Sequence, residues 1–291
     1  MARILLPGQR AELIVADVAS GVLHTVYSSD TLLFEAPNWT PDGRWLVVNG
    51  DGRLFRLPAN GSGEPEPIDL GGVPEINNDH VVAPDGRHVY VSAADGHIHR
   101  IGWYEAEPLR VTDEQAPERG FRHYLHGISP DGGTLAYVGT ENSGQRRLYT
   151  RPVGGGADTL VGDGFSPADG PEFGPDGEWL YFNSEIASTE PGHAQMFRVR
   201  RDGSGLTQLT DDERVNWFPH VSPDGRLIAY VSFPTGTLGH PENVPVTVRL
   251  MGTDGAGHRD VAAVFGGQGT MNVPSWAPDS RRFAFVAYPM A

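Results

Sequence analysis

Short runs of alternating apolar and polar residues recur along this chain at a nearly constant spacing. Six of these runs follow the turn Pro-Asp-Gly or a near copy, and they read RWLVVNG, RHVYVSA, GTLAYVGT, EWLYFNSE, RLIAYVSF and RRFAFVAY. Intervals of 43, 46, 45, 48 and 55 residues separate the turns, which begin at Pro41, Pro84, Pro130, Pro175, Pro223 and Pro278. Alternation with a period of two is typical of β-strands, so each copy predicts two strands joined by a tight turn.

The turn residues have a conformational explanation that needs no catalytic role. Proline presets φ at the first turn position, aspartate suits the next, and glycine tolerates positive φ. An aspartate follows the proline in every copy, which favours turn formation over catalysis for Asp42, Asp85, Asp131, Asp176, Asp224 and Asp279.

Two more strand-like runs complete most of the repeats. The fourth repeat continues with QMFRVR and LTQLT, and the fifth with VTVRLMG and RDVAAVF. Four strands in a repeat of about 45 residues are typical of a propeller blade. The sequence therefore predicts an all-β protein with one domain over residues 1–291, a six-bladed β-propeller with four antiparallel strands per blade.

The two ends of the chain are expected to share one blade. Residues 1–30 contain two strand-like runs, ELIVADV and VLHTVYS, whereas only DSRRFAFVAYPMA follows the last proline turn. We expect residues 1–30 to supply the outer strands of the closing blade and residues 272–291 its inner strands, a closure that removes an open sheet edge. The other blades are expected to start near residues 35, 77, 123, 169 and 216.

Composition narrows the classes of partner and chemistry. The formal net charge of −15 argues against nucleic acid and anionic membrane as partners. No apolar run is long enough for a transmembrane helix, and the broken apolar run near the start does not resemble a signal peptide, so we expect a cytoplasmic location. The absence of cysteine excludes disulfides, thiol catalysis and zinc–thiolate sites.

Polar residues gather where the innermost strand of each blade should open at the mouth of the central channel. Three or four places before the turn prolines stand His80, His126, Glu172 and His220. Two unusually long loops, SEIASTEPGHAQ and FPTGTLGHPENVPV, should reach the same face, and the second adds His240.

This set suggests metal-assisted chemistry. Imidazoles and a carboxylate are common ligands of divalent ions such as manganese or zinc, with calcium also open, and a free histidine could transfer a proton. The predicted metal ligands are His126, His220 and Glu172, and the predicted proton-transfer groups are His80 and His240. The predicted substrate-binding residues are Asn216, Trp217, Asp169 and Asn38. The alternatives are water-bonded channel histidines and a Trp217 that packs between blades.

The repeat resembles that of the TolB-type propellers, in which SPDG precedes a strand similar to IAYVS, as in SPDGRLIAYVS over residues 222–232. The resemblance covers nearly the whole chain. It also extends, more distantly, to oligogalacturonate lyase, which would imply histidine-held manganese and removal of a proton next to a uronate carboxylate. Unlike the peptidases that carry similar propellers, the sequence contains no Gly-x-Ser-x-Gly elbow.

Two functions follow as hypotheses, since a fold alone does not define a function. The first is a carbohydrate lyase that acts on a sugar or uronate oligosaccharide with a histidine-held divalent metal at the channel mouth. The second is a non-catalytic TolB-like propeller that binds a protein partner or a small molecule.

Overall fold

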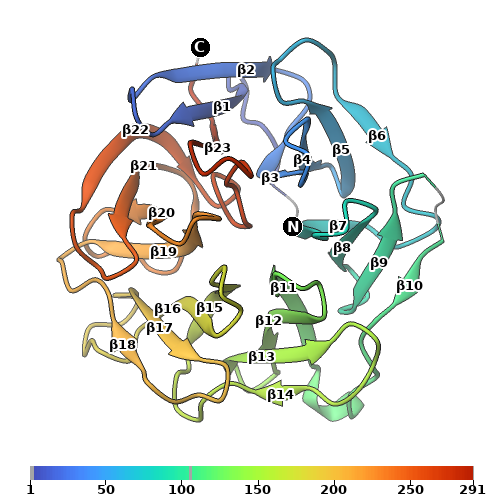
Figure 1. Ribbon diagram of the computed structural model, residues 1–291, viewed down its shortest axis with the longest axis vertical. Coiled ribbons are helices and arrows are strands. Elements are labelled where there is room, and N and C mark those ends of the chain that lie inside the picture. Colours follow the sequence, from blue (N-terminus) through green and yellow to red (C-terminus); the bar gives the residue numbers. More distant parts are fainter. Residues whose placement is uncertain (1–2, 105–106, 291) are drawn as a thin grey trace.

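Six antiparallel sheets stand around one central axis, and the chain passes through them in sequence order (Figure 1). The computed structural model describes residues 3–104 and 107–290. The predicted all-β six-bladed propeller is confirmed. Within the described ranges no helix is long and apolar enough to cross a membrane.

Five blades contain four strands each, ordered outward from the axis. Blade one comprises β3 (Glu35–Trp39), β4 (Trp45–Gly50), β5 (Arg53–Pro58) and β6 (Glu66–Ile68). Blade two comprises β7 (Ile76–Val82), β8 (His88–Ala93), β9 (Ile98–Gly102) and β10 (Leu109–Arg110). Blade three follows a short 3-10 helix, η1 (Pro117–Arg119), and comprises β11 (Arg122–Ile128), β12 (Thr134–Thr140), β13 (Arg146–Pro152) and β14 (Thr159–Leu160).

The remaining strands complete the ring. Blade four comprises β15 (Ala168–Phe173), β16 (Trp179–Ser184), β17 (Gln195–Arg200) and β18 (Thr207–Gln208). Blade five comprises β19 (Val215–Val221), β20 (Leu227–Phe233), β21 (Glu242–Gly252) and β22 (Arg259–Gly267). The closing blade comprises β1 (Ala11–Asp17), β2 (Leu23–Ser29) and β23 (Arg282–Ala287).

The closing blade joins the two ends of the chain, as the sequence predicted. Its strand order is β2-β1-β23, and Ile14 pairs with Phe285 in the middle of the β1–β23 ladder (Figure 1). On the axial side of β23 the ladder is reduced to a bridge between Trp276 and Phe283. The innermost strand of this blade is therefore shorter than its five counterparts.

The turn aspartates act as turn formers, which confirms the prediction. In the first copy, the Asp42 carboxylate accepts hydrogen bonds from the Thr40 hydroxyl at 2.6 Å and from the Arg44 amide at 3.0 Å. Gly43 has a φ of 71°, the left-handed conformation that glycine adopts without a steric penalty. The sixth copy places Ser280 in the same conformation at 59°.

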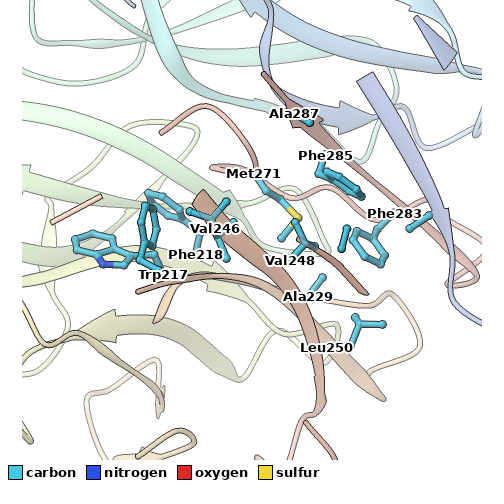
Figure 2. Packing of buried hydrophobic residues seen from close by; sticks show 14 of the residues in the cluster. Trp217, Phe218, Ala229, Val246, Val248, Leu250, Met271, Phe283, Phe285 and Ala287 are labelled. Atoms are coloured by element: carbon cyan, nitrogen blue, oxygen red, sulfur yellow. The ribbon is translucent and has the colours of Figure 1, made fainter. Parts of the chain in front are cut away.

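The hydrophobic core is divided into six clusters, each between two neighbouring blades. Val47 and Val89, for example, join blades one and two, and Met196 and Tyr230 join blades four and five. The largest cluster lies between blade five and the closing blade, where Trp217 and Phe283 belong to the same packed group (Figure 2). Each sheet is thus buried on both faces by its neighbours, which explains why strand residues of both alternating sets are apolar.

Side chains near the axis tie neighbouring inner strands together. The Val82 amide of blade two donates a hydrogen bond of 2.6 Å to Asn38 Oδ1 of blade one. The Val221 amide of blade five donates one of 2.9 Å to Glu172 Oε1 of blade four. Asn38 and Glu172 both stand three residues before a turn proline, so this repeat position provides an acceptor for the next blade.

Replacing Glu172 with alanine should lower the free energy of unfolding by about 3–5 kcal/mol, because it leaves a buried amide and a buried histidine without their partner. Urea denaturation followed by fluorescence would measure the change, with Glu178→Ala in the exposed turn of the same blade as the control. Equal midpoints for the two variants would contradict the role of Glu172 as a tie between blades.

Candidate functional site

The innermost strands are interrupted by bulges just above the level of the inter-blade ties. The register shifts fall between Glu35 and Asn38, Ile76 and His80, Leu125 and Gly127, Asp169 and Glu172, and Trp217 and His220. In three blades the residue five places before the turn proline has a positive φ: Ala36 at 50°, Gly170 at 62° and Phe218 at 58°. A non-glycine residue pays a steric cost there, so the surrounding packing must hold the bulge in place.

Two adjoining cavities open at this end of the channel. One has a volume of about 460 Å³ and the other about 260 Å³. Both are lined by Asn77, Asn78, Tyr124 and Gln268, so they form one continuous hollow, which we call the funnel.

One repeat position supplies much of the funnel wall. Six places before the turn prolines stand Glu35, Asn78, Tyr124, Asp169, Trp217 and Asn272. All but Trp217 line a cavity, and the Trp217 ring lies 4.4 Å from the ring of His240, which does. An acidic or amide residue stands at this position in four of the six copies, which is a partial signal for the wall in the sequence.

The channel mouth lies farther from the proline turns than the sequence predicted. Three of the nine predicted residues line the funnel, namely His126, Asp169 and His240. The other six do not appear in the lining of either cavity, and all are buried: Asn38, His80, Glu172, Asn216, Trp217 and His220. The bulges explain the difference, because they separate the residues that face the funnel from those that bond to the next blade.

Two of these buried residues have clear structural roles. His80 is fully buried, with Nε2 3.4 Å from the Val47 carbonyl, and burial lowers its pKa to about 4. It is therefore neutral at neutral pH, and it does not line the funnel, where the predicted proton-transfer group would have to lie. Asn216 donates to Asp212 at 2.8 Å and accepts from Ser232 at 2.7 Å, which accounts for its amide without a substrate.

The predicted metal ligands do not fit a metal ion. Nδ1 of His220 lies 2.6 Å from Glu172 Oε2, and its Nε2 lies 3.3 Å from the Met271 carbonyl oxygen. Both nitrogens of His126 also face oxygen atoms, as described below. Among the described residues there is no group of three or more histidine, cysteine, aspartate or glutamate side chains arranged to hold a metal. We therefore derive no chemistry through one.

His126 instead forms the centre of a buried charge cluster. Its Nε2 lies 3.1 Å from Asp169 Oδ1, and its Nδ1 lies 3.1 Å from the Asn272 carbonyl oxygen. Since both oxygens are acceptors, both ring nitrogens carry hydrogen and the ring is an imidazolium. Burial opposes this charge, but the attraction of Asp79 and the bond to Asp169 outweigh it and raise the pKa of His126 to about 9.

The funnel wall carries two further perturbed carboxyl groups. Burial raises the pKa of Asp79 to about 6, although the His126 charge opposes the shift. Burial also raises the pKa of Glu35 to about 7. Glu35 Oε2 accepts a hydrogen bond of 3.2 Å from Asn49, whereas Oε1 is buried with no donor among the described residues. Perturbed carboxyl groups in a cavity mark it as a candidate functional site.

The funnel as a whole has an excess of acidic groups. Its carboxylates are Glu35, Asp51, Glu75, Asp79, Asp169 and Glu242. Against these stand the His126 imidazolium and three arginines, namely Arg3, Arg122 and Arg146. A concave surface with this balance attracts cations more strongly than anions.

The second long loop contributes His240 to the funnel, and also Glu242 where the loop passes into β21. His240 precedes β21, and its ring lies against the rings of Trp217 at 4.4 Å and Phe218 at 5.2 Å. Burial lowers the pKa of His240, so its ring is neutral at neutral pH. Nδ1 is buried with no hydrogen-bond partner among the described residues. The other long loop does not reach the funnel through His193, which bonds to Ser188 and to the Asp212 carbonyl.

These features define a six-bladed propeller with a polar, acidic funnel at one end of its axis. A protein of Agrobacterium fabrum whose name describes it as uncharacterized is 38% identical over 260 residues, covering 88% of this chain and 85% of that protein. A solved structure of a candidate TolB from Agrobacterium tumefaciens is 35% identical, with a TM-score of 0.89 over 97% of this chain and 99% of that one. The chain belongs to their family of TolB-like six-bladed β-propellers.

More distant similarities agree on the fold. The Tol-Pal system protein TolB of Francisella tularensis is 22% identical over 278 residues, and this chain spans 60% of its length. An oligogalacturonate lyase solved in complex with manganese is 15% identical, with a TM-score of 0.59 over 91% of this chain and 75% of the lyase. At this identity the likeness shows the shared fold alone. No family model matches the chain.

The His126 charge should make stability depend on pH in a defined direction. A histidine with a raised pKa adds stability that is fully present below its unfolded value of 6.5 and is lost as the pH rises through about 9. Wild type should therefore lose stability relative to His126→Asn across that window. Paired urea titrations would measure the difference, and a constant difference from pH 6.5 to beyond 9 would contradict the imidazolium assignment.

Proposed function

We propose that this protein is a non-catalytic binding propeller whose funnel receives a positively charged segment of a partner protein. The observation that carries the proposal is the pair of buried carboxyl groups, Glu35 and Asp79, in the funnel wall. Burial of a carboxylate is costly, all the more where a donor is missing as at Glu35 Oε1, and a cation in the funnel would offset that cost. Both groups are 6% exposed or less.

The rim supports the same proposal. Asp51, Glu75 and Glu242 are exposed and line the wider cavity around Glu35. Exposed charges of one sign around a concave site accelerate the approach of an oppositely charged partner and contribute less to affinity. The wall carboxyl groups would then contribute the short-range recognition.

The state of the histidines favours binding over metal catalysis. His126 and His220 already have hydrogen-bond partners at both ring nitrogens within the protein, so neither offers a free lone pair to a metal. The names of two TolB relatives, one of them a Tol-Pal system protein, point to a partner protein for this family rather than to a reaction.

A fluorescent, capped peptide of alternating lysine and glycine should bind the protein, and a matched glutamate–glycine peptide should not. The Asp51→Asn, Glu75→Gln double variant should weaken lysine-peptide binding about three- to tenfold, since each exposed charge contributes a fraction of a kcal/mol. Higher salt should weaken it further. Fluorescence anisotropy would measure all three effects.

The matched control is the Asp163→Asn, Glu178→Gln double variant, which neutralises two exposed carboxylates outside the funnel and changes the net charge equally. An equal loss of affinity in the two double variants would show that only net charge matters. That result, or equal binding of the two peptides, would contradict a specific cation site in the funnel.

A carbohydrate lyase is the second candidate. The observation that favours it is the neutral His240 ring in the same cavity as the His126 imidazolium and Arg146. In a lyase, the positive charges of His126 and Arg146 would attract a uronate carboxylate, and His240 would remove the proton on the carbon next to it. The C–H electron pair would form a C=C bond as the glycosidic C–O bond on the adjacent carbon breaks, and the leaving oxygen would take a proton from water. The excess of carboxylates around the funnel opposes an anionic substrate, which is why we place this function second.

Incubation with a panel of uronate oligosaccharides separates the two candidates. The lyase would form an unsaturated product whose ultraviolet absorbance grows with time, and His240→Ala should abolish the signal. We expect no such signal from the wild type, with or without added manganese. A signal that His240→Ala removes would replace the binding proposal with the enzyme.

A further inference from the structure

One arginine of this chain is already bound in the acidic wall of the funnel. Arg3 is only 5% exposed, and its guanidinium carbon lies 3.3 Å from the centre of the Tyr288 ring. Its Nη2 donates a hydrogen bond of 2.9 Å to Asn243 Oδ1, and its Nη1 donates to the Gln268 carbonyl oxygen. A planar cation stacked on an aromatic face with oxygen acceptors at its edge is the geometry of guanidinium recognition.

Two carboxylates complete the electrostatic surroundings of this guanidinium. Glu242 Oε2 lies 3.9 Å from Arg3 Nε, and Glu35 lines the same cavity. The charge of Arg3 acts to lower the pKa of Glu35 against the effect of burial. Arg3 Nε and Glu35 Oε1 are nevertheless both buried without a hydrogen-bond partner among the described residues. The site thus contains an acceptor that the present occupant leaves unused.

The segment that carries Arg3 is attached mainly by side-chain hydrogen bonds. Residues 3–8 lie outside every strand, and the side chains of Ile4 and Leu6 are 68% and 40% exposed. Gln9 anchors the segment, since its Nε2 donates to Asn243 Oδ1 at 2.8 Å and to the Tyr288 carbonyl at 3.0 Å. Release of this segment would therefore expose the pocket without breaking a strand ladder, at the cost of the packing of Leu5 against the apolar cluster between the closing blade and blade one.

We propose that Tyr288, Asn243, Gln268, Glu242 and Glu35 form a guanidinium-binding pocket, and that Arg3 is its internal occupant. An arginine in the basic segment of a partner exchanges with Arg3 and opens the wider cavity. The inference rests on the proposed function and specifies it, because it names arginine rather than any cation as the group recognised at this wall.

The shape of the pocket explains a preference for arginine over lysine. A guanidinium can stack on the Tyr288 ring while it donates to Asn243 and Gln268, as Arg3 does, and Glu35 Oε1 offers an acceptor for a third N–H. An ammonium group is compact and strongly hydrated, and it cannot keep the stacking and all three bonds together. Asn243 is held in a left-handed conformation with a φ of 58°, and its one side-chain oxygen accepts from both Arg3 and Gln9.

The test removes the Arg3 side chain from the pocket by mutation and measures whether a small arginine derivative binds there instead. N-acetyl-arginine amide is titrated into wild type, Arg3→Ala and Gln9→Ala by calorimetry, with N-acetyl-lysine amide as the matched probe. Arg3→Ala should bind the arginine probe at one site at least about tenfold more tightly than wild type does, and more tightly than it binds the lysine probe. Gln9→Ala, which keeps every pocket residue but loosens the segment, should show an intermediate gain.

Glu35→Gln in the Arg3→Ala background should remove most of the gain, whereas Glu178→Gln, in an exposed turn outside the funnel, should leave it unchanged. Thermal unfolding of each variant checks that it is folded. The arginine probe should also raise the melting temperature of Arg3→Ala more than that of wild type. Equal binding by wild type, Arg3→Ala and Gln9→Ala, or equal binding of the two probes by Arg3→Ala, would overturn the proposal.

A failure of the guanidinium pocket can be distinguished from a failure of the proposed cation-binding function. If the lysine–glycine peptide binds wild type and depends on the rim carboxylates, but Arg3→Ala gains no arginine binding, only the guanidinium pocket is wrong. If Arg3→Ala binds the arginine probe while the lysine–glycine peptide binds no variant, the pocket stands and the broader cation-binding funnel fails.

Discussion

The constraint on which this structure depends is that no blade can bury both faces of its sheet alone. Each sheet packs against a neighbour on either side, so the core consists of clusters between blades, as between Val47 and Val89. A row of such sheets would leave two bare faces at its ends. The chain avoids this by pairing β1 with β23, so that residues from its two ends form one blade between blades five and one. The ring is thus held closed by the same apolar packing that forms each interface.

Closure also decides which residues remain for function. Around the axis six inner strands converge, and their edge amides find side-chain acceptors in the neighbouring blade rather than a further strand. Asn38 and Glu172 serve in this way, and the bulges just above them separate this layer from the funnel. The result is a layer of polar residues that bond between blades, beneath a layer of polar residues that line the funnel. Residues only three places apart in sequence, such as Asp169 and Glu172, therefore have different roles.

That layering explains how far the sequence could be interpreted. The proline turns repeat at regular intervals and each is followed by alternating strands, so the blade count and the closing blade were predictable from local patterns. The site was only partly predictable, because a bulge leaves no mark in the periodicity of its strand. His220 and His126 both precede a turn by three or four residues, yet one bonds to Glu172 between blades and the other lines the funnel. Arg3 could not have been found, since its neighbours Tyr288 and Gln268 lie at the far end of the chain.

The two halves of the funnel, one around His126 and one around Glu35, differ in how well their charges are balanced. Around His126 the balance is internal, since the imidazolium faces Asp169 directly and its charge also acts on Asp79. Around Glu35 the balance depends on Arg3, which belongs to a segment outside the sheets. A ligand cation should bind weakly around His126. The charges there are already neutralised, and the ligand would have to displace a bonded group that belongs to a rigid blade. The ligand gains more beside Glu35, where the competing cation sits on a segment outside the strands and an acceptor oxygen is free. Selectivity in this protein should therefore arise at the Glu35 wall, although burial and charge perturb the pKa values of both His126 and Glu35.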